Sequence, residues 1–208
     1  MKHDPVKHQR RLIRLRGYDY ARAGAYFVTI VTKERACLFG EIVNGEMRLN
    51  QFTCIVQAAW DELVRHYQRV ECDAFVVMPN HIHGIIVLVD DGGVGPNDVG
   101  AGLKPARGGL GPAATTRAGL KPAPTQRGLP EIIRAFKTFS ARRINESRAT
   151  PGAPVWQRNY YEHVVRGENE LRRIREYIAN NPLQWELDRE NPLRTSDRLK
   201  RKAEAWEV

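Results

Sequence analysis

The sequence predicts an α+β domain in which one antiparallel sheet carries helices packed on one face. Two observations support this fold class. Short runs rich in β-branched and aromatic residues alternate with longer segments whose apolar residues recur at helical spacing. Their order is strand, helix, strand, strand, helix, strand, helix, which a single sheet with covering helices accommodates economically. A ferredoxin-like or RRM-like arrangement has this order.

Local patterns predict each element. Residues 26–32 read Tyr-Phe-Val-Thr-Ile-Val-Thr, a run typical of a buried strand. Residues 51–67 carry apolar side chains at helical spacing, while Pro130 and Pro182 mark the start of the second helix and the end of the third. Asn44-Gly45 is a preferred two-residue turn, which predicts a small hairpin over 41–49. The other predicted elements are strands at 72–78, 81–89 and 160–165 and helices at 130–145 and 168–181.

The overall charge favours a polyanionic partner. The 208 residues carry a formal net charge of +9, so nucleic acid is expected first and an acidic membrane surface second. Three scattered cysteines, without a Cys-x-x-Cys pair, argue against a disulfide framework and a thiolate zinc site, and they fit a reducing cytoplasm. No run approaches the roughly 20 apolar residues of a membrane span, and no signal peptide is recognisable.

The chain is expected to form one domain over residues 23–185, between a basic N-terminal arm at 1–22 and a charged C-terminal tail at 186–208. A Gly/Pro-rich insert at about 92–128 interrupts this domain. It contains no aromatic residue and no isoleucine, so it is expected to be disordered or loosely held. The insert contains Ala-Gly-Leu-Lys-Pro-Ala twice, which indicates either a low-complexity expansion or a palindromic DNA repeat read in frame.

His81 and His83 are the first candidate site. They are two residues apart in a predicted strand, so both imidazoles should point to the same face and could share a divalent metal. Apolar residues on both sides place the pair on a rigid element rather than a loop. Gly84 removes a side chain next to the pair and could let a substrate backbone approach. Two histidines on a solvated strand face are the alternative.

Tyr177 and Asn181 are the second candidate site. They are four residues apart in the last predicted helix, which makes them neighbours on one helix face. A phenol and an amide oxygen are therefore presented together. The alternative is a boundary tyrosine with its hydroxyl in water, followed by an asparagine that ends a helix before proline.

Several motifs outside the insert belong together. In chain order they are Tyr-Asp-Tyr at 18–20, Tyr-Phe-Val-Thr at 26–29, Met-Pro-Asn-His-Ile-His-Gly at 78–84, Trp-Gln-Arg-Asn-Tyr-Tyr-Glu-His at 156–163, and Tyr-Ile-x-x-Asn-Pro at 177–182. With these motifs the chain resembles the REP-associated tyrosine transposases, a branch of the single-tyrosine HUH transposases. The long insert departs from the compact members. The resemblance implies the RRM-like HUH nuclease fold, a divalent metal, and single-stranded or hairpin DNA as substrate.

By this resemblance, His81 and His83 become metal ligands, Asn181 the third ligand and Tyr177 the nucleophile. The implied activity is that of an endonuclease and strand transferase. Mg²⁺ or Mn²⁺ would polarise the scissile phosphate, and the phenol would attack it to leave a 5′-phosphotyrosine and a free 3′-hydroxyl. A 3′-hydroxyl from another end would then reverse the step. Because the covalent link conserves the bond energy, no ATP is required.

The DNA itself is expected to contact further residues. Three cations of the helix at 130–145 fall off its apolar face, and three residues of the 156–163 motif could bind DNA or simply pack. These candidates are Arg134, Lys137, Arg142, Trp156, Arg158 and His163. A homodimer and a monomer are both compatible with the sequence. The expected location is the cytoplasm, with nucleoid association when DNA is bound.

Two other functions remain open from the residues alone. The first is a non-catalytic, RRM-like nucleic-acid-binding module that leaves Tyr177 idle. The second is a zinc hydrolase built on His81 and His83, for which Asp90 and Asp91 are the nearby carboxylates along the strand.

Overall fold

The computed structural model describes residues 15, 17–90, 128–192 and 194. The predicted insert therefore lies almost entirely outside the described residues. In chain order the elements are strand β1 (Gly24–Val31), a 3-10 turn η1 (Lys33–Arg35), strands β2 (Gly40–Val43) and β3 (Glu46–Leu49), helix α1 (Gln51–His66), strands β4 (Val70–Met78) and β5 (His81–Leu88), helix α2 (Leu129–Ser147), strand β6 (Tyr161–Val164), helix α3 (Glu168–Asn180) and a second 3-10 segment η2 (Pro182–Leu187).

Four strands form the main sheet in the order β4-β5-β1-β6, and every neighbouring pair is antiparallel. With α1 between β1 and β4, and α2 between β5 and β6, this is the ferredoxin-like order, so the predicted α+β class is confirmed. The predicted hairpin is also present as β2 and β3. Its turn residues Asn44 and Gly45 both have positive φ, 53° and 79°, as a tight turn of this kind requires.

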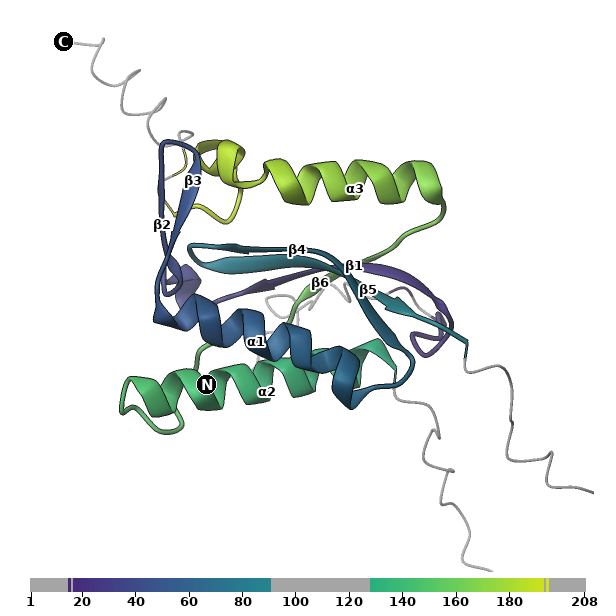
Figure 1. Cartoon of the computed structure of the whole chain (residues 1–208), viewed down its shortest axis with the longest axis horizontal. Helices are drawn as coiled ribbons and strands as arrows, with labels where there is room; N and C mark the ends of the chain where they lie inside the picture. Colours follow the sequence, from purple (N-terminus) through teal and green to yellow (C-terminus); the bar gives the residue numbers. More distant parts are fainter. Residues whose placement is uncertain (1–14, 16, 91–127, 193, 195–208) are drawn as a thin grey trace, which may run out of the picture.

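Helices α1 and α2 lie together on one face of the sheet (Figure 1). Asn50 caps α1 by accepting hydrogen bonds from the backbone N–H groups of Phe52 and Thr53. The interface between these helices and the sheet forms the main core, in which Trp60 of α1 stacks on Phe75 of β4 at 4.5 Å between ring centroids. Burial of these apolar side chains is the dominant favourable contribution to folding.

Gly84 belongs to this core, which corrects its predicted role. A Cβ atom at position 84 would lie 2.5 Å from two ring atoms of Trp60 and 3.1 Å from Phe75. The glycine faces away from the two histidines because successive strand residues point to opposite faces. It therefore makes room for Trp60 and not for a substrate backbone.

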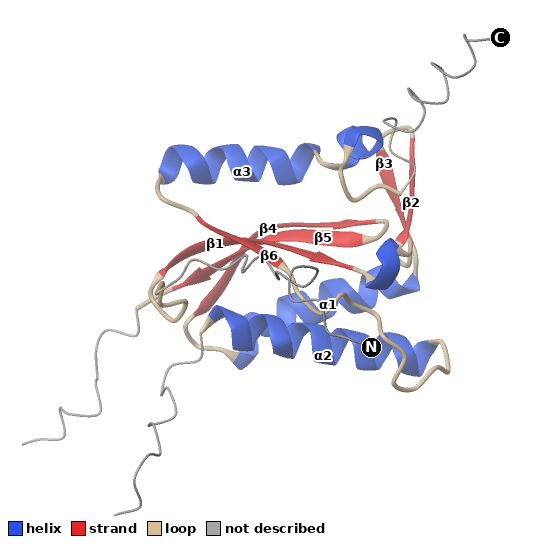
Figure 2. Cartoon of the chain, turned by 180° about the vertical axis from the view of Figure 1, so that it is seen from behind, coloured by secondary structure: helices blue, strands red, loops and turns tan. Residues whose placement is uncertain are grey.

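Helix α3 covers the opposite face of the sheet, as Figures 1 and 2 both show. The expectation that all helices pack on one face holds for α1 and α2 but is wrong for α3. A second, smaller core explains the position of α3, since Ile178 packs there with Phe27 of β1 and Ile85 of β5. Leu171 and Ile174 extend this contact along the helix.

A charged contact also holds α3 on the sheet. Arg175 donates hydrogen bonds to both carboxylate oxygens of Asp73, the shortest of which is 2.6 Å. Asp73 lies where the register between β4 and β5 shifts, between Cys72 and Phe75. Such an irregularity redirects a side chain out of the regular alternation. The carboxylate thereby reaches a helix that crosses above the strand.

The described parts of the two flanking segments contact the domain. Tyr20, from the predicted N-terminal arm, is buried in the main core, and Asp188, Glu190 and Asn191, from the predicted C-terminal tail, are buried as well. Among the described residues, no helix combines the length and the apolar character needed to cross a bilayer.

Candidate active site

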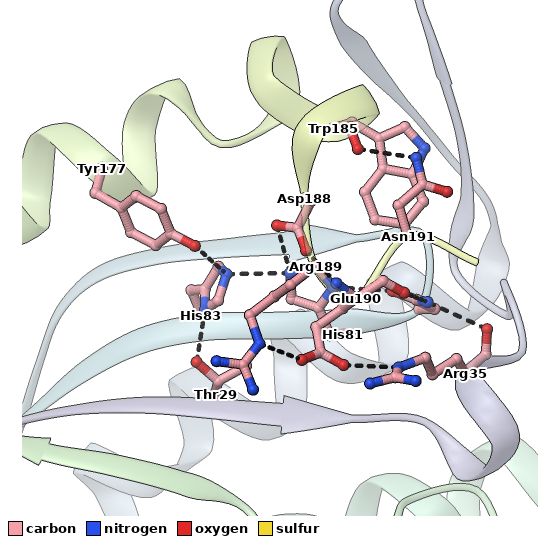
Figure 3. A network of polar contacts seen from close by, with 11 residues as sticks. Thr29, Arg35, His81, His83, Tyr177, Trp185, Asp188, Arg189, Glu190 and Asn191 are labelled. Carbon is pink, nitrogen blue, oxygen red and sulfur yellow. Dashed lines mark hydrogen bonds and ion pairs between the residues drawn. The ribbon is translucent and has the colours of Figure 1, made fainter. Parts of the chain in front are cut away.

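The two histidines lie side by side on the α3 face of the sheet. His81 and His83 are residues of β5, a central strand, and both are buried. Their Nε2 atoms are 3.1 Å apart. The strand alternation thus brings together the two imidazoles as the sequence predicted (Figure 3).

Hydrogen bonds to the other ring nitrogens orient both imidazoles. His81 Nδ1 lies 2.8 Å from the Asn80 side-chain oxygen, and Asn80 uses its amide nitrogen to donate to the carbonyls of Arg35 and Glu190. That amide oxygen can only accept, so neutral His81 carries its proton on Nδ1 and presents a lone pair on Nε2. His83 Nδ1 lies 2.9 Å from the Thr29 hydroxyl. Partners of this kind are typical of histidines that bind a metal through Nε2.

Burial keeps both imidazoles neutral at physiological pH. Desolvation lowers the pKa of His81 from 6.5 to about 4, against a smaller opposing effect of Glu190. Desolvation also lowers the pKa of His83 well below 6.5, and His81 adds to this effect. Neutral imidazoles are the form that binds a metal ion.

Tyr177 approaches the same point from α3. Its hydroxyl lies 3.2 Å from His83 Nε2, and its ring packs edge-on against Phe27. Burial raises the pKa of the phenol above its ordinary value of 10, and Asp188 raises it further, whereas the neighbouring Asn181 side chain lowers it. Without an added positive charge, the phenol is therefore a weaker nucleophile than a free tyrosine.

Asn181 caps the C-terminal end of α3 and is buried. Its side-chain oxygen is inaccessible to solvent and accepts no hydrogen bond from any residue that the structure describes. A buried amide oxygen without a partner is unfavourable by about 1–3 kcal/mol. The predicted third ligand therefore has an acceptor to offer, although the structure records no direct contact between it and the histidines.

Sequence reasoning missed the carboxylate that lies closest to the histidines. Asp188 Oδ2 is 3.8 Å from His81 Nε2, and one donor atom each from His81, His83 and Asp188 all lie within 4.8 Å of one another. Asp188 belongs to the charged segment assigned to the tail, where nothing in the local pattern distinguishes it from solvated neighbours. Only its position after the turn at Pro182 indicates that the chain folds back here.

The segment around Asp188 is fixed over the site by a second carboxylate (Figure 3). Glu190 accepts hydrogen bonds from Arg35 at 2.9 Å and from Arg189 at 3.1 Å, and its backbone carbonyl accepts from Asn80 at 2.7 Å. Together these contacts hold residues 188–190 along one wall of a cavity of about 340 Å³ that also contains His83 and Tyr177.

The donor set suits a divalent cation. The two imidazoles and the Asp188 carboxylate offer a mixed nitrogen and oxygen set, which fits Mn²⁺ well and Mg²⁺ less well, and the unpartnered amide oxygen of Asn181 is a further candidate. Asp90, the described carboxylate considered for a zinc hydrolase, is exposed beyond the far end of β5 beside Arg69. Asp91 lies outside the described residues.

The six predicted DNA-binding residues lie in different environments. Arg134, Arg142 and Arg158 are exposed, and Arg142 pairs with Glu146. Lys137 donates to the carbonyls of Gln157 and Arg158. His163 forms a 2.8 Å contact with Glu170, which connects β6 to α3.

Trp156 is buried in the main core, which favours the packing alternative over stacking on a base. Its indole nitrogen donates to the Ser140 hydroxyl, and its ring packs against Phe39 and Phe136. The indole therefore packs in the core, and Trp156 also borders a cavity beside α2.

Comparisons with known proteins identify relatives. No protein-family model matches the sequence. A Haemophilus influenzae protein described as "Uncharacterized protein" is 38% identical over 185 residues, which cover 87% of this chain and 92% of the relative. A second H. influenzae protein, described as "Putative REP-associated tyrosine transposase", is 27% identical over 165 residues, covering 79% and 73%.

Two solved structures are also similar. One is described as a REP-associated tyrosine transposase bound to a REP hairpin, with 19% identity, a TM-score of 0.49 and coverage of 82% of this chain and 73% of that chain. The other is a transposase-like protein of Deinococcus radiodurans R1, with 19% identity, a TM-score of 0.38 and coverage of 80% and 95%.

Proposed function

The chain belongs to the same family as the H. influenzae protein to which it is 38% identical and resembles the REP-associated tyrosine transposases, and from this premise we propose that it cuts and rejoins single-stranded or hairpin DNA. Tyr177 is the proposed nucleophile. The observation that carries the proposal is the contact of the Tyr177 hydroxyl with His83, whose imidazole is grouped with that of His81 and the carboxylate of Asp188. The proposed place of action is the cytoplasm, at the DNA.

In the proposed step, the Tyr177 oxygen attacks the phosphorus of a DNA phosphodiester. The bond between phosphorus and the 3′-oxygen breaks, a 5′-phosphotyrosine forms, and the leaving oxygen becomes a free 3′-hydroxyl. The phenol loses one proton and the leaving oxygen gains one, so the step consumes no water and no nucleoside triphosphate. A 3′-hydroxyl from another strand end can reverse the same step.

The residues present would hold a divalent cation through His81 and His83, with Asn181 and Asp188 as the candidate oxygen ligands. When bound, such an ion supplies positive charge to the phosphate and to the leaving oxygen. Asn80 and Thr29 keep the imidazoles oriented, while Phe27 packs against the rings of both Tyr177 and His83 and limits their movement. These contacts preorganise the site before DNA arrives.

One feature of the fold disfavours the non-catalytic module. An RRM-like binder stacks bases on an open sheet face. In this chain α3 covers that face and turns Tyr177 toward the histidines. The covering helix supports catalysis more than a binding function that leaves the tyrosine idle.

The test is to incubate the full-length protein with Mg²⁺ or Mn²⁺ and labelled hairpin oligonucleotides and to separate the products on denaturing gels. Covalent protein–DNA adducts should form with the native chain and disappear in Tyr177→Phe. Tyr67→Phe, which changes a tyrosine on the α1 side of the molecule, is the matched control and should retain them. DNA cleavage that persists unchanged in Tyr177→Phe would reject the tyrosine as nucleophile and indicate hydrolysis at the histidine–aspartate group.

A further inference from the structure

A second cavity lies next to the candidate active site. It has a volume of about 490 Å³ and lies between helix α2 and the segment 153–160; we name it the α2 groove. This volume falls within the range of roughly 300–1,000 Å³ that is typical of small-molecule sites. No step of the proposed chemistry uses it.

The α2 groove adjoins the active-site cavity. Gln157 and Tyr160 line both of them, so the segment 157–160 is the wall that they share. On its other side, the groove shares Thr138 and Ala141 with a further hollow along α2 of about 660 Å³. The three cavities are therefore neighbours: the active-site cavity lies on the α3 side of the segment 157–160, and the other two lie along α2.

The shared wall is held in place by the protein itself. Lys137 donates from its ammonium to the carbonyls of Gln157 and Arg158, at 2.5 and 2.9 Å. The Gln157 backbone N–H donates to Val31 at the end of β1, and Trp156 bridges to Thr32. Lys137 thus stabilises the wall, and other cations are expected to contact phosphates. The groove is formed without a ligand.

The lining of the groove combines apolar surface with positive charge. Ile133 and Val155 contribute apolar surface, Arg134 and Arg158 are exposed at the groove, and no Asp or Glu lies among the residues that line it. The carboxylate of Glu131 lies 4.0 Å from the guanidinium of Arg134. An apolar floor suits a nucleobase, and exposed guanidinium groups suit phosphates.

We infer that the α2 groove binds the single-stranded DNA that adjoins the phosphate held at Tyr177, with a base in the cavity and its phosphates on Arg134 and Arg158. This inference rests on the proposed function, because the strand that enters the groove is the one whose phosphate is proposed to bind at Tyr177. The position of the groove next to that site favours DNA over an acidic peptide, which would match the charge alone. Trp156 and Lys137 also line the groove, and their contacts with neighbouring residues keep its shape.

The test measures binding of fluorescein-labelled hairpins to the full-length protein, with Tyr177→Phe used to prevent cleavage. The hairpins carry no extension or an extension of roughly six thymidines on either strand end, a length within the range of single-strand binding sites. An extension on one side should tighten binding about 10-fold. The double variant Arg134→Ala/Arg158→Ala should lose this gain, and its salt dependence should fall by about 0.7 in log–log slope for each lost phosphate contact.

Arg65→Ala is the matched control, since Arg65 is exposed on α1 and lines none of the three cavities. It should retain the extension gain. A 4-thiothymidine placed in the extension should cross-link under ultraviolet light to the peptide that contains 153–160. Extensions that give no gain on either side, or a gain that the double variant retains, would overturn the inference.

Measuring whether the native chain forms covalent adducts distinguishes a failure of this inference from a failure of the proposed function. If adducts form but extensions give no gain, the groove is not a DNA site and the tyrosine chemistry stands. If no hairpin forms an adduct but the extension gain depends on Arg134 and Arg158, the groove binds DNA and the proposed chemistry fails. Cross-links that map to α3 alone would count against the groove.

Discussion

The Tyr177 hydroxyl lies 3.2 Å from Nε2 of His83, although 94 positions separate the two residues in the chain. They meet because β5 presents His83 on the face that α3 covers. The contact depends on how α3 is placed on the sheet. Any change that shifts this helix should therefore affect the chemistry more than the stability of the domain.

Arg175→Ala should reduce adduct formation several-fold while leaving the unfolding temperature nearly unchanged. The guanidinium joins α3 to Asp73 at the irregular position of β4, two residues before the nucleophile. The pair is partly exposed, so it contributes only modestly to overall stability, but it restricts the position of Tyr177. Single-turnover rates of adduct formation and thermal unfolding, measured on the same preparations, check this prediction.

Arg172→Ala is the control for that experiment, because Arg172 is exposed on the same helix and bonds only to Asn169 among the described residues. Arg175→Lys should restore part of the rate. Equal rates for Arg175→Ala and the native chain would show that the apolar contacts of α3 position the tyrosine on their own.

Asp188→Asn should weaken Mn²⁺ binding by at least about 10-fold, as expected when a group that contacts or orients metal ligands is altered. The carboxylate lies within 4.8 Å of the donor atoms of His81 and His83. His81→Ala and His83→Ala should abolish measurable binding. Isothermal titration calorimetry on chelator-treated protein measures the affinities, and the unfolding temperature should rise with Mn²⁺ in the native chain.

Asp90→Asn provides the matched carboxylate control, since Asp90 is exposed at the other end of β5. Asn181→Ala tests the ligand implied by family resemblance. If Asn181→Ala weakens Mn²⁺ binding and Asp188→Asn does not, the amide is the third ligand and Asp188 is a neighbour without a direct role.

Acidification should destabilise the chelator-treated protein between about pH 6.5 and pH 4. Burial lowers the pKa of His81 from 6.5 to about 4 in the folded chain, so the unfolded chain binds more protons in this window. The stability is complete above pH 6.5 and falls as the pH decreases toward 4, by at most about 3 kcal/mol for this residue. Urea unfolding at a series of pH values measures the slope, and His81→Gln should reduce it while leaving the part that His83 contributes. A native profile that is already flat would contradict the buried, neutral imidazole.

The sequence predicted the parts of the structure that depend on local patterns. Alternation along β5 was enough to bring His81 and His83 to one face, and helical spacing was enough to pair Tyr177 with Asn181. The sequence did not predict that α3 covers the opposite face from α1 and α2, because its short apolar stripe fits either side. Asp188 was missed for a similar reason: its approach to His81 follows from a turn after Pro182 and from the contact between Glu190 and Arg35, which are distant in the chain. Such tertiary contacts leave no periodic signal.

Gly84→Ala distinguishes packing from substrate binding at the residue next to His83. The added methyl would lie 2.5 Å from the Trp60 ring, so the helix face of the core must move, at a cost of about 1–3 kcal/mol in unfolding free energy. A smaller side chain at position 60 should relieve this cost, and the double variant Gly84→Ala/Trp60→Leu should be more stable than the sum of the single effects predicts. Urea unfolding of the four proteins completes the cycle. If Gly84→Ala instead leaves stability unchanged and abolishes DNA binding, the glycine serves the substrate, and the contact with Trp60 is not the reason that position 84 lacks a side chain.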